Sequence, residues 1–186
     1  MGQVTKEQLK ELFTRVDKRL KKKLDVYIIG GASAILGYEV IKETNDVDVD
    51  GPIDPDFKAI FEDEADTLGL DLYLSSRGIF SPPDGYRNRC HSEDFPAEKL
   101  RVWYLDQYDL AISKLDRGLG KDYEDLQRVH KKKPFSYEQL IEIFNNEYIN
   151  VSAIGNLREK KMNLVDLILN LFGSEYAEDA KKKVGL

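Results

Sequence analysis

Two neighbouring stretches decide the fold: YIIGGASAILGY at residues 27–38 and TNDVDVD at residues 44–50. The first is a short apolar run that stops at two glycines, which predicts a buried strand, a tight turn and then a short helix. In the second, aspartates alternate with valines, as in a half-buried strand with one polar face. The aspartates that share this face are Asp46, Asp48 and Asp50.

The glycine turn and the acidic strand together supply the parts of a phosphate-transfer site. Glycines let the backbone approach a phosphate closely, and the helix that follows offers free N–H groups to an anion. Carboxylates one residue apart, at Asp46 and Asp48, project from the same face and can share divalent cations. Each half alone is ordinary, because a Gly-Gly pair is usually a turn and an acidic strand is usually a polar sheet face.

A glycine-led turn, a short helix and an Asp-x-Asp strand, in this order and spacing, resemble the DNA polymerase β-type nucleotidyltransferase superfamily. The resemblance implies an α/β (α+β) fold in which helices flank a mixed β-sheet. It implies that Asp46 and Asp48 bind Mg²⁺ or Mn²⁺ and that the substrate is an NTP. It also implies that Gly30, Gly31 and Ser33 hold the phosphates, with Ser33 or the Gly31 amide in the place of the usual serine.

A third carboxylate normally completes the metal site in that superfamily. Asp71 is the expected residue, because leucines alternate with polar residues over 70–75 and predict a strand with Asp71 on its polar side. Asp50 is the second candidate and is more typical of a charge at the end of a strand. If Asp71 points away from Asp46 and Asp48, the site has two acids and catalysis becomes questionable.

Further charged residues fall on apolar helix faces in DLAISKLDRGLGKDYEDL, residues 109–126. Lys114 lies on the apolar stripe of its predicted helix, and Asp122 and Asp125 share a face with apolar residues. A buried charge is costly unless it meets an opposite charge. Two explanations stay open: a buried Lys–Asp pair that ties two helices together, or a Lys114 that reaches a nucleotide phosphate while Asp122 orients it or helps to activate the acceptor.

A strand, a DLxxxKL helix and then KDxxDL resemble the AbiEii-type abortive-infection nucleotidyltransferases and the related small enzymes of bacterial toxin–antitoxin operons. The resemblance covers about residues 24–130 and implies an active site of Asp46, Asp48, Lys114 and Asp122. It also implies an acceptor such as RNA, tRNA or a protein side chain, and a cognate antitoxin as partner. The helical tail of this chain is smaller than is typical of that group.

The remaining sequence predicts a mixed α/β part followed by helices. Thr5 and Gln8 form a capping-box pattern before the first helix, and Leu100–Leu105 predicts the last strand. The helices expected after it are Gln107–Leu115, Asp122–His130, one that begins with a capping box of Ser136 and Gln139, and a long one that ends at Gly173. We therefore divide the chain into a nucleotidyltransferase core, residues 1–105, and a helical C-terminal region packed on the core, residues 106–186.

Composition favours an ordinary soluble globular protein, with 41% hydrophobic and 33% charged residues and a net charge of -6. Cys90 is the single cysteine, so no internal disulfide can form, and no long apolar run predicts a membrane segment. We expect a cytoplasmic protein. Lysine runs at 21–23, 131–133 and 181–183 are either basic patches or, more commonly, solvated helix ends.

Four arginines near the connection between the later strands could grip a triphosphate or an RNA backbone, although isolated surface arginines are commoner. They are Arg77, Arg87, Arg89 and Arg101. The main alternative to an enzyme is a catalytically inactive scaffold of the same fold that binds a nucleotide or a protein partner.

Overall fold

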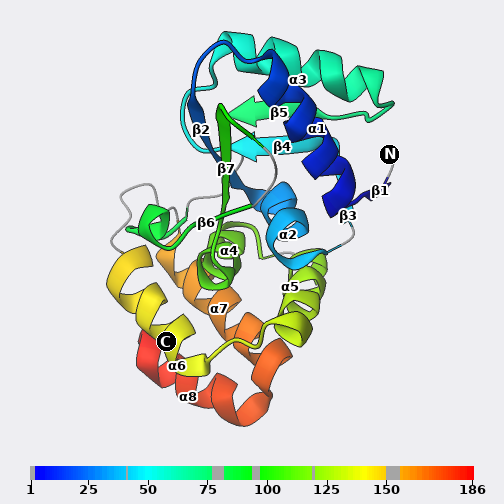
Figure 1. Ribbon diagram of the computed structural model, residues 1–186. Helices are drawn as coiled ribbons and strands as arrows, with labels where there is room; N and C mark the ends of the chain where they lie inside the picture. Colours follow the sequence, from blue (N-terminus) through cyan, green and yellow to red (C-terminus); the bar gives the residue numbers. More distant parts are fainter. Residues whose placement is uncertain (1–2, 41, 77–81, 94–96, 119, 150–155) are drawn as a thin grey trace. The chain divides into compact units, whose positions relative to one another are not determined.

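The computed structural model describes residues 3–40, 42–76, 82–93, 97–118, 120–149 and 156–186 (Figure 1). The chain forms two compact units. Unit 1 comprises Met1–Gly78 and Cys90–Leu105, and unit 2 comprises Ile79–Arg89 and Asp106–Leu186. Unit 1 contains the strands, and the described part of unit 2 is helical.

Unit 1 is built on a mixed five-stranded sheet with the order β5-β4-β2-β7-β6. Its strands are β2 (Leu24–Ile29), β4 (Asp46–Val49), β5 (Tyr73–Ser76), β6 (His91–Ser92) and β7 (Leu100–Tyr104). Strand β2 is antiparallel to β4 and parallel to β7, whereas β4 is parallel to β5 and β6 is antiparallel to β7. A separate two-stranded antiparallel sheet pairs β1 (Gln3–Val4) with β3 (Lys42–Glu43).

The helices of unit 1 are α1 (Lys6–Arg19), α2 (Gly30–Tyr38) and α3 (Pro55–Thr67). The predicted capping box at the start of α1 is confirmed. Gln8 N–H donates to Thr5 Oγ1 at 3.3 Å, and Thr5 N–H donates to Gln8 Oε1 at 2.9 Å. Asp54 caps α3 by accepting the N–H groups of Asp56 and Phe57, each at 3.1 Å.

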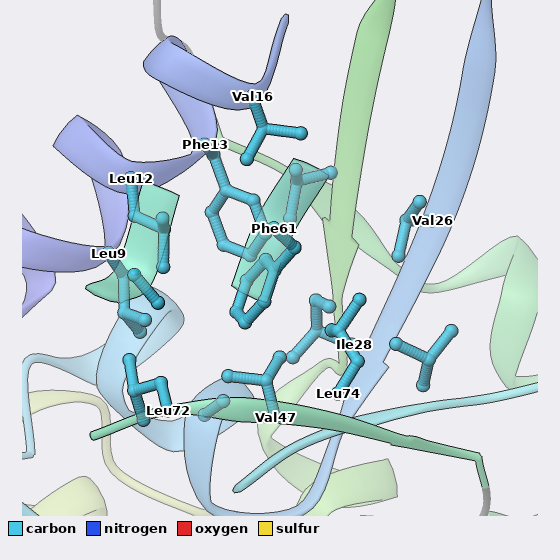
Figure 2. Close-up of a cluster of buried hydrophobic side chains, with 14 of the residues drawn as sticks. Leu9, Leu12, Phe13, Val16, Val26, Ile28, Val47, Phe61, Leu72 and Leu74 are labelled. Carbon is cyan, nitrogen blue, oxygen red and sulfur yellow. The ribbon is translucent and has the colours of Figure 1, made fainter. Parts of the chain in front are cut away.

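The apolar core of unit 1 lies between one face of the sheet and helices α1 and α3 (Figure 2). Phe13 of α1 and Phe61 of α3 meet at its centre, with ring centroids 5.9 Å apart. The strands contribute every second side chain to it: Val26 and Ile28 of β2, Val47 and Val49 of β4, Leu74 of β5, and Leu100 and Val102 of β7. Because side chains alternate along a strand, the aspartates of β4 face the other way, which confirms the predicted α/β arrangement.

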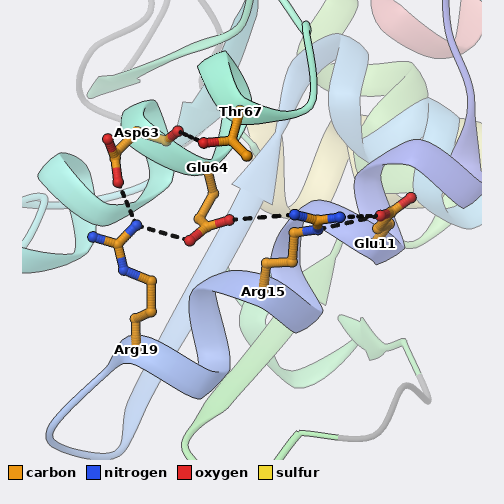
Figure 3. A network of polar contacts seen from close by, with 6 residues as sticks. All are labelled: Glu11, Arg15, Arg19, Asp63, Glu64 and Thr67. Atoms are coloured by element: carbon orange, nitrogen blue, oxygen red, sulfur yellow. Dashed lines mark hydrogen bonds and ion pairs between the residues drawn. The ribbon is translucent and has the colours of Figure 1, made fainter.

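On their solvent side, α1 and α3 are joined by a network of ion pairs (Figure 3). Arg19 binds Asp63 and lies 2.7 Å from Glu64 Oε1. Arg15 lies 2.9 Å from Glu11 and 3.9 Å from Glu64. Exposed pairs of this kind contribute little to stability, so the packing of these helices depends on the apolar core.

Unit 2 contains a short turn η1 (Tyr86–Asn88) and a series of helices. These are α4 (Gln107–Ser113), η2 (Lys114–Asp116), α5 (Gly120–Lys132), α6 (Tyr137–Ile143), η3 (Phe144–Tyr148), α7 (Leu157–Phe172) and α8 (Ser174–Val184). No helix among the described residues is long and apolar enough to cross a membrane.

Two details of unit 2 differ from the prediction. The predicted helix Gln107–Leu115 ends at Ser113 and continues as the 3₁₀ turn η2. Ser136 caps α6 by accepting from Gln139 N–H at 3.4 Å, but its own N–H donates to Tyr108 Oη at 2.8 Å. Only half of the expected capping box forms, because the Ser136 N–H is bonded to a tyrosine of another helix and not to the Gln139 side chain.

Candidate active site

Strand β4 presents Asp46 and Asp48 on the face of the sheet opposite the core. Asp46 is half-buried, and its Oδ1 accepts from Thr44 Oγ1 at 2.9 Å. Asp48 is 6% exposed and accepts a hydrogen bond from Ser75 Oγ, the residue paired with it on β5. Two residues span roughly 6.6 Å along a strand, so both carboxylates can reach a cation held between them.

The glycine turn directly adjoins the Asp48 carboxylate. Ile29, the last residue of β2, pairs with Asp48, and Gly30 then begins α2 with a φ of 64°. A Cβ at Gly30 would lie 2.8 Å from Asp48 Oδ2, closer than carbon and oxygen can approach. Ile29 offers no side-chain cap to the first turn of α2, so the half-buried Gly31 amide is a candidate donor to an anion.

Ser33 does not lie where a phosphate could reach it. Its side chain is fully buried, and its Oγ accepts the Leu105 N–H at 2.9 Å. This bond ties α2 to the end of β7. The placement argues against Ser33 as a phosphate ligand, which leaves Gly31 as the better of the two expected candidates.

Asp71 does not lie on a strand beside Asp48, contrary to the expectation. Strand β5 begins at Tyr73, and Asp71 precedes it as an exposed residue that accepts from Asn45 Nδ2 at 2.8 Å. Leu70, Leu72 and Leu74 all pack on the apolar core, as their alternation indicates, but Leu70 N–H bonds back to the Ala65 carbonyl in a turn that follows α3, and β5 starts only after this turn. The residue that β5 places beside Asp48 is Ser75.

Asp50, the second candidate for a third ligand, follows the end of β4. It is half-buried, and its N–H donates to the Tyr27 carbonyl at 2.9 Å. Within the described ranges, no three His, Cys, Asp or Glu side chains gather closely enough to hold a metal ion by themselves. The acidic site that these residues form is therefore the pair Asp46 and Asp48.

In unit 2, Lys114 and Asp122 are brought together as a buried ion pair. Lys114 is 2% exposed, and its Nζ lies 2.9 Å from Asp122 Oδ1 and 3.6 Å from Asp125 Oδ2. Arg117 donates to both oxygens of Asp122, at 2.6 and 2.9 Å. Burial alone would raise the pKa of Asp122, but the hydrogen bonds from Arg117 and the charge of Lys114 outweigh it and lower the pKa to about 2. Of the two explanations that the sequence leaves open, this arrangement matches the first, a buried Lys–Asp pair that ties two helices together.

The expected arginines occupy different settings. Arg77 lies outside the described residues. Arg89 makes two hydrogen bonds to Asp109, at 2.6 and 3.0 Å, and lies 2.7 Å from Glu147. Burial raises the pKa of Asp109, although Arg89 opposes this effect. Arg89 is thus engaged in the interior contacts of unit 2, whereas Arg101 is exposed on β7.

One comparison with known proteins places the chain in a family. A family described as "Nucleotidyltransferase of unknown function (DUF6036)" matches residues 7–173. The chain belongs to this family. The match supports the nucleotidyltransferase superfamily without extending to the AbiEii-type branch. No curated protein and no solved structure matches the chain.

The donor set of this family member fits a magnesium ion that takes its other ligands from phosphate groups and water. Asp46 and Asp48 provide hard carboxylate oxygens on one face of β4. Mg²⁺ is commonly bound by one or two carboxylates together with substrate phosphates and water, rather than by a full cage of protein ligands. Two protein acids are therefore compatible with a metal–nucleotide site.

Three residues around the acidic pair of this family member were not predicted. Ser75 binds Asp48 from β5, and Tyr27 and Trp103 stack on the same sheet face with ring centroids 5.9 Å apart. Alternation along a strand predicts which face of the sheet each side chain occupies. No local pattern in the sequence shows that β2 and β7 are neighbouring strands or how their residues pair. The pairing of Tyr27 with Trp103 therefore emerges only in the structure.

Proposed function

We propose that this protein is a metal-dependent nucleotidyltransferase that moves a nucleoside monophosphate from an NTP to an acceptor. One observation carries the proposal: the Asp48 carboxylate lies 2.8 Å from the position of a Cβ at Gly30. The metal-binding face of β4 and the start of α2 therefore meet at one point. A carboxylate pair beside an uncapped helix start can bind the divalent cation and the phosphates of an NTP at the same time.

In this proposal Asp46 and Asp48 hold Mg²⁺ or Mn²⁺, and the Gly31 amide with the first turn of α2 binds the β- and γ-phosphates. When bound, the cation would offset the negative charge of the triphosphate. An acceptor oxygen forms a bond to the α-phosphorus while the bond from that phosphorus to the bridging oxygen breaks. Pyrophosphate leaves with the electron pair, and the proton of the acceptor hydroxyl passes to solvent.

For Lys114 and Asp122 we propose a positioning role, since both are buried in one ion pair. They join η2 to α5 and fix the turn between them. Direct contact with a phosphate would require Lys114 to leave Asp122. A catalytic Lys114 predicts that Lys114→Arg keeps the fold but loses transfer, whereas a positioning Lys114 predicts that stability and transfer fall together.

The test is label transfer from NTPs that carry the label on either the α- or the γ-phosphate, in the presence of Mg²⁺ and a mixture of cellular RNA and protein. Nucleotidyl transfer places the α-label, and not the γ-label, on an acceptor. Asp46→Asn and Asp48→Asn should each abolish it, while Asp63→Asn, an exposed acid on α3, should not. Transfer of the γ-label alone would indicate a kinase, and no transfer with any NTP would reject the enzyme.

The finer assignment to the AbiEii-type toxin branch rests on the DLxxxKL and KDxxDL segments. It extends the proposal to a growth-arresting enzyme that acts on RNA, tRNA or a protein and is neutralised by a cognate antitoxin. Expression of the native chain should then arrest bacterial growth, and Asp48→Asn should relieve the arrest. Equal growth with both chains would remove the toxin role and leave the transfer reaction untouched.

The second candidate is a scaffold of the same fold that binds a nucleotide or a partner without catalysis. The position of Asp71 favours it, because this acid precedes β5 and does not join the pair on β4. The scaffold predicts that NTPs raise the melting temperature without label transfer.

A further inference from the structure

Strands β2 and β7 carry polar and aromatic side chains on the face opposite the apolar core. Their parallel register pairs Asp25 with Arg101 and Tyr27 with Trp103. The intervening residues, such as Val26 and Val102, belong to the core. Asp25 and Arg101 are exposed, while Tyr27 and Trp103 are half-buried. Aromatic side chains thus occupy the polar face of the sheet beside exposed charges.

The two aromatic rings are held in a defined orientation. They are nearly parallel, with an interplanar angle of 10° and centroids 5.9 Å apart. Trp103 Nε1 donates to Asp25 Oδ1 at 2.9 Å, and the Arg101 guanidinium lies 5.6 Å from the centroid of the Trp103 ring. These contacts fix the indole before any ligand arrives, which lowers the entropy cost of stacking a planar group against it.

A hollow of about 250 Å³ opens where β2 and β7 begin, beside this aromatic pair. Its charged lining consists of Lys23, Lys99 and Arg101 against Asp25 and Glu98. Asp25 already accepts the indole N–H. The lining has three positive and two negative side chains, and the Asp17 carboxylate accepts the N–H groups of Glu98, Lys99 and Leu100, so binding of an anion here depends on individual contacts with Arg101 and Lys99 and not on a net positive charge.

The aromatic pair also adjoins the acidic pair of the candidate active site. The Tyr27 carbonyl accepts the N–H of Asp50, and two residues further along β2, Ile29 pairs with Asp48. From Asp25 to Ile29 the strand covers roughly 13 Å, at about 3.3 Å per residue. Within this length the strand runs from the hollow with Arg101 and Lys99, past the aromatic rings, to the residue that pairs with Asp48.

We propose that this face binds an unpaired polynucleotide strand and presents its end to Asp46 and Asp48. A base stacks against Trp103 and Tyr27, and the backbone phosphates lie near Arg101 and Lys99. Stacking on aromatic side chains beside a positive groove is how proteins hold single strands without reading their sequence. A duplex keeps its base faces covered and cannot make this contact. The role of the strand as acceptor rests on the proposed nucleotidyl transfer, but its binding does not.

The test uses the fluorescence of Trp103, which is the single tryptophan of the chain. A single-stranded RNA octamer is titrated into the full chain without NTP or added metal, and an RNA duplex and inorganic tripolyphosphate serve as comparisons. We expect saturable quenching by the single strand only. Quenching should weaken as salt is raised, because bound phosphates release counterions.

Variants of the basic residues test where the strand lies. Arg101→Gln with Lys99→Gln should weaken binding at least tenfold, and the slope of log K against log salt should fall by about 1.4, since each phosphate contact contributes roughly 0.7. The matched control, Lys131→Gln with Lys132→Gln, removes two exposed lysines of unit 2 and should leave binding unchanged. Arg101→Lys keeps the positive charge and should retain most of the affinity of the native chain. A loss of affinity in the glutamine variants but not in Arg101→Lys would then reflect the lost charge and not a folding defect.

Three results would overturn the proposal: no quenching by the single strand, equal quenching by the duplex, or full affinity in the variant that lacks Arg101 and Lys99. Asp46→Asn with Asp48→Asn should still bind the octamer, because the titration needs no transfer. Binding without any label transfer would uphold the strand site and reject the proposed enzyme. Transfer of the α-label to a protein, together with no quenching by RNA, would uphold the proposed enzyme and reject the strand site.

Discussion

The contact between Gly30 and Asp48 predicts the effect of one added methyl group. Gly30→Ala places a Cβ 2.8 Å from Asp48 Oδ2, so the carboxylate has to move. Its φ of 64° also forces alanine into the left-handed region, which costs roughly 1–2 kcal/mol. For a chain of this size the melting temperature should fall by about 2–8 °C. A misplaced reacting group can lower a rate on the order of 100-fold, and we expect a loss of this size in label transfer.

Gly69→Ala separates the two effects of this substitution. Gly69 has a φ of 68°, but nothing lies within 4 Å of its Cβ position. In thermal unfolding it should therefore lose only the part of the stability that the left-handed backbone costs in Gly30→Ala, and it should keep full transfer activity. Equal activity in the two variants would refute the reasoning, because the position of the Asp48 carboxylate would then not matter for the reaction.

Three further predictions concern stability. Thr5→Ala removes the cap of α1 and should cost about 1 kcal/mol, measured by thermal unfolding, with Thr67→Ala near the end of α3 as a milder control. Lys114→Met removes the buried cation beside Asp122 and Asp125 while Arg117 still binds Asp122, so it should destabilise by roughly 1.5–3 kcal/mol in urea. Exposed Lys131→Met should change little, and a loss below about 1 kcal/mol in Lys114→Met would contradict the buried pair. The pKa of Asp122 in the folded protein, about 2, lies below its ordinary value of 3.8, so its ion pairs stabilise the protein above pH 3.8 and lose this effect as the pH falls toward 2. The difference in unfolding free energy between the native chain and Asp122→Asn should therefore shrink over this pH interval. A constant difference would contradict the assignment.

The sequence was informative where a pattern is local. Alternation over 46–49 placed both aspartates on one strand face, since side-chain direction follows directly from strand geometry. The glycine turn and the capping box of α1 are likewise formed by residues close together in the chain. The helical character of residues 106–186 followed from apolar periodicity, although the break at Gly173 yields a separate helix, α8.

Features that depend on distant partners could not be predicted. Ser33 looks like a phosphate ligand in sequence, but its partner, the Leu105 amide, lies 72 residues away. Asp71 fits an alternating pattern that in fact spans a turn after α3 and the first residues of β5, so periodicity alone misplaced the start of β5. For Lys114 the pattern indicated burial correctly, and only the structure showed that Asp122 neutralises it.

The central claim is that Asp46 and Asp48 hold the divalent cation with its nucleotide. Mn²⁺ binding, followed by electron paramagnetic resonance with an NTP analogue that cannot be cleaved between the α- and β-phosphates, tests it directly. The account predicts nucleotide-dependent Mn²⁺ binding in the native chain and in Asp63→Asn, and its loss in Asp46→Asn and in Asp48→Asn. Unchanged binding in both of these site variants would show that the metal lies elsewhere and would contradict the account.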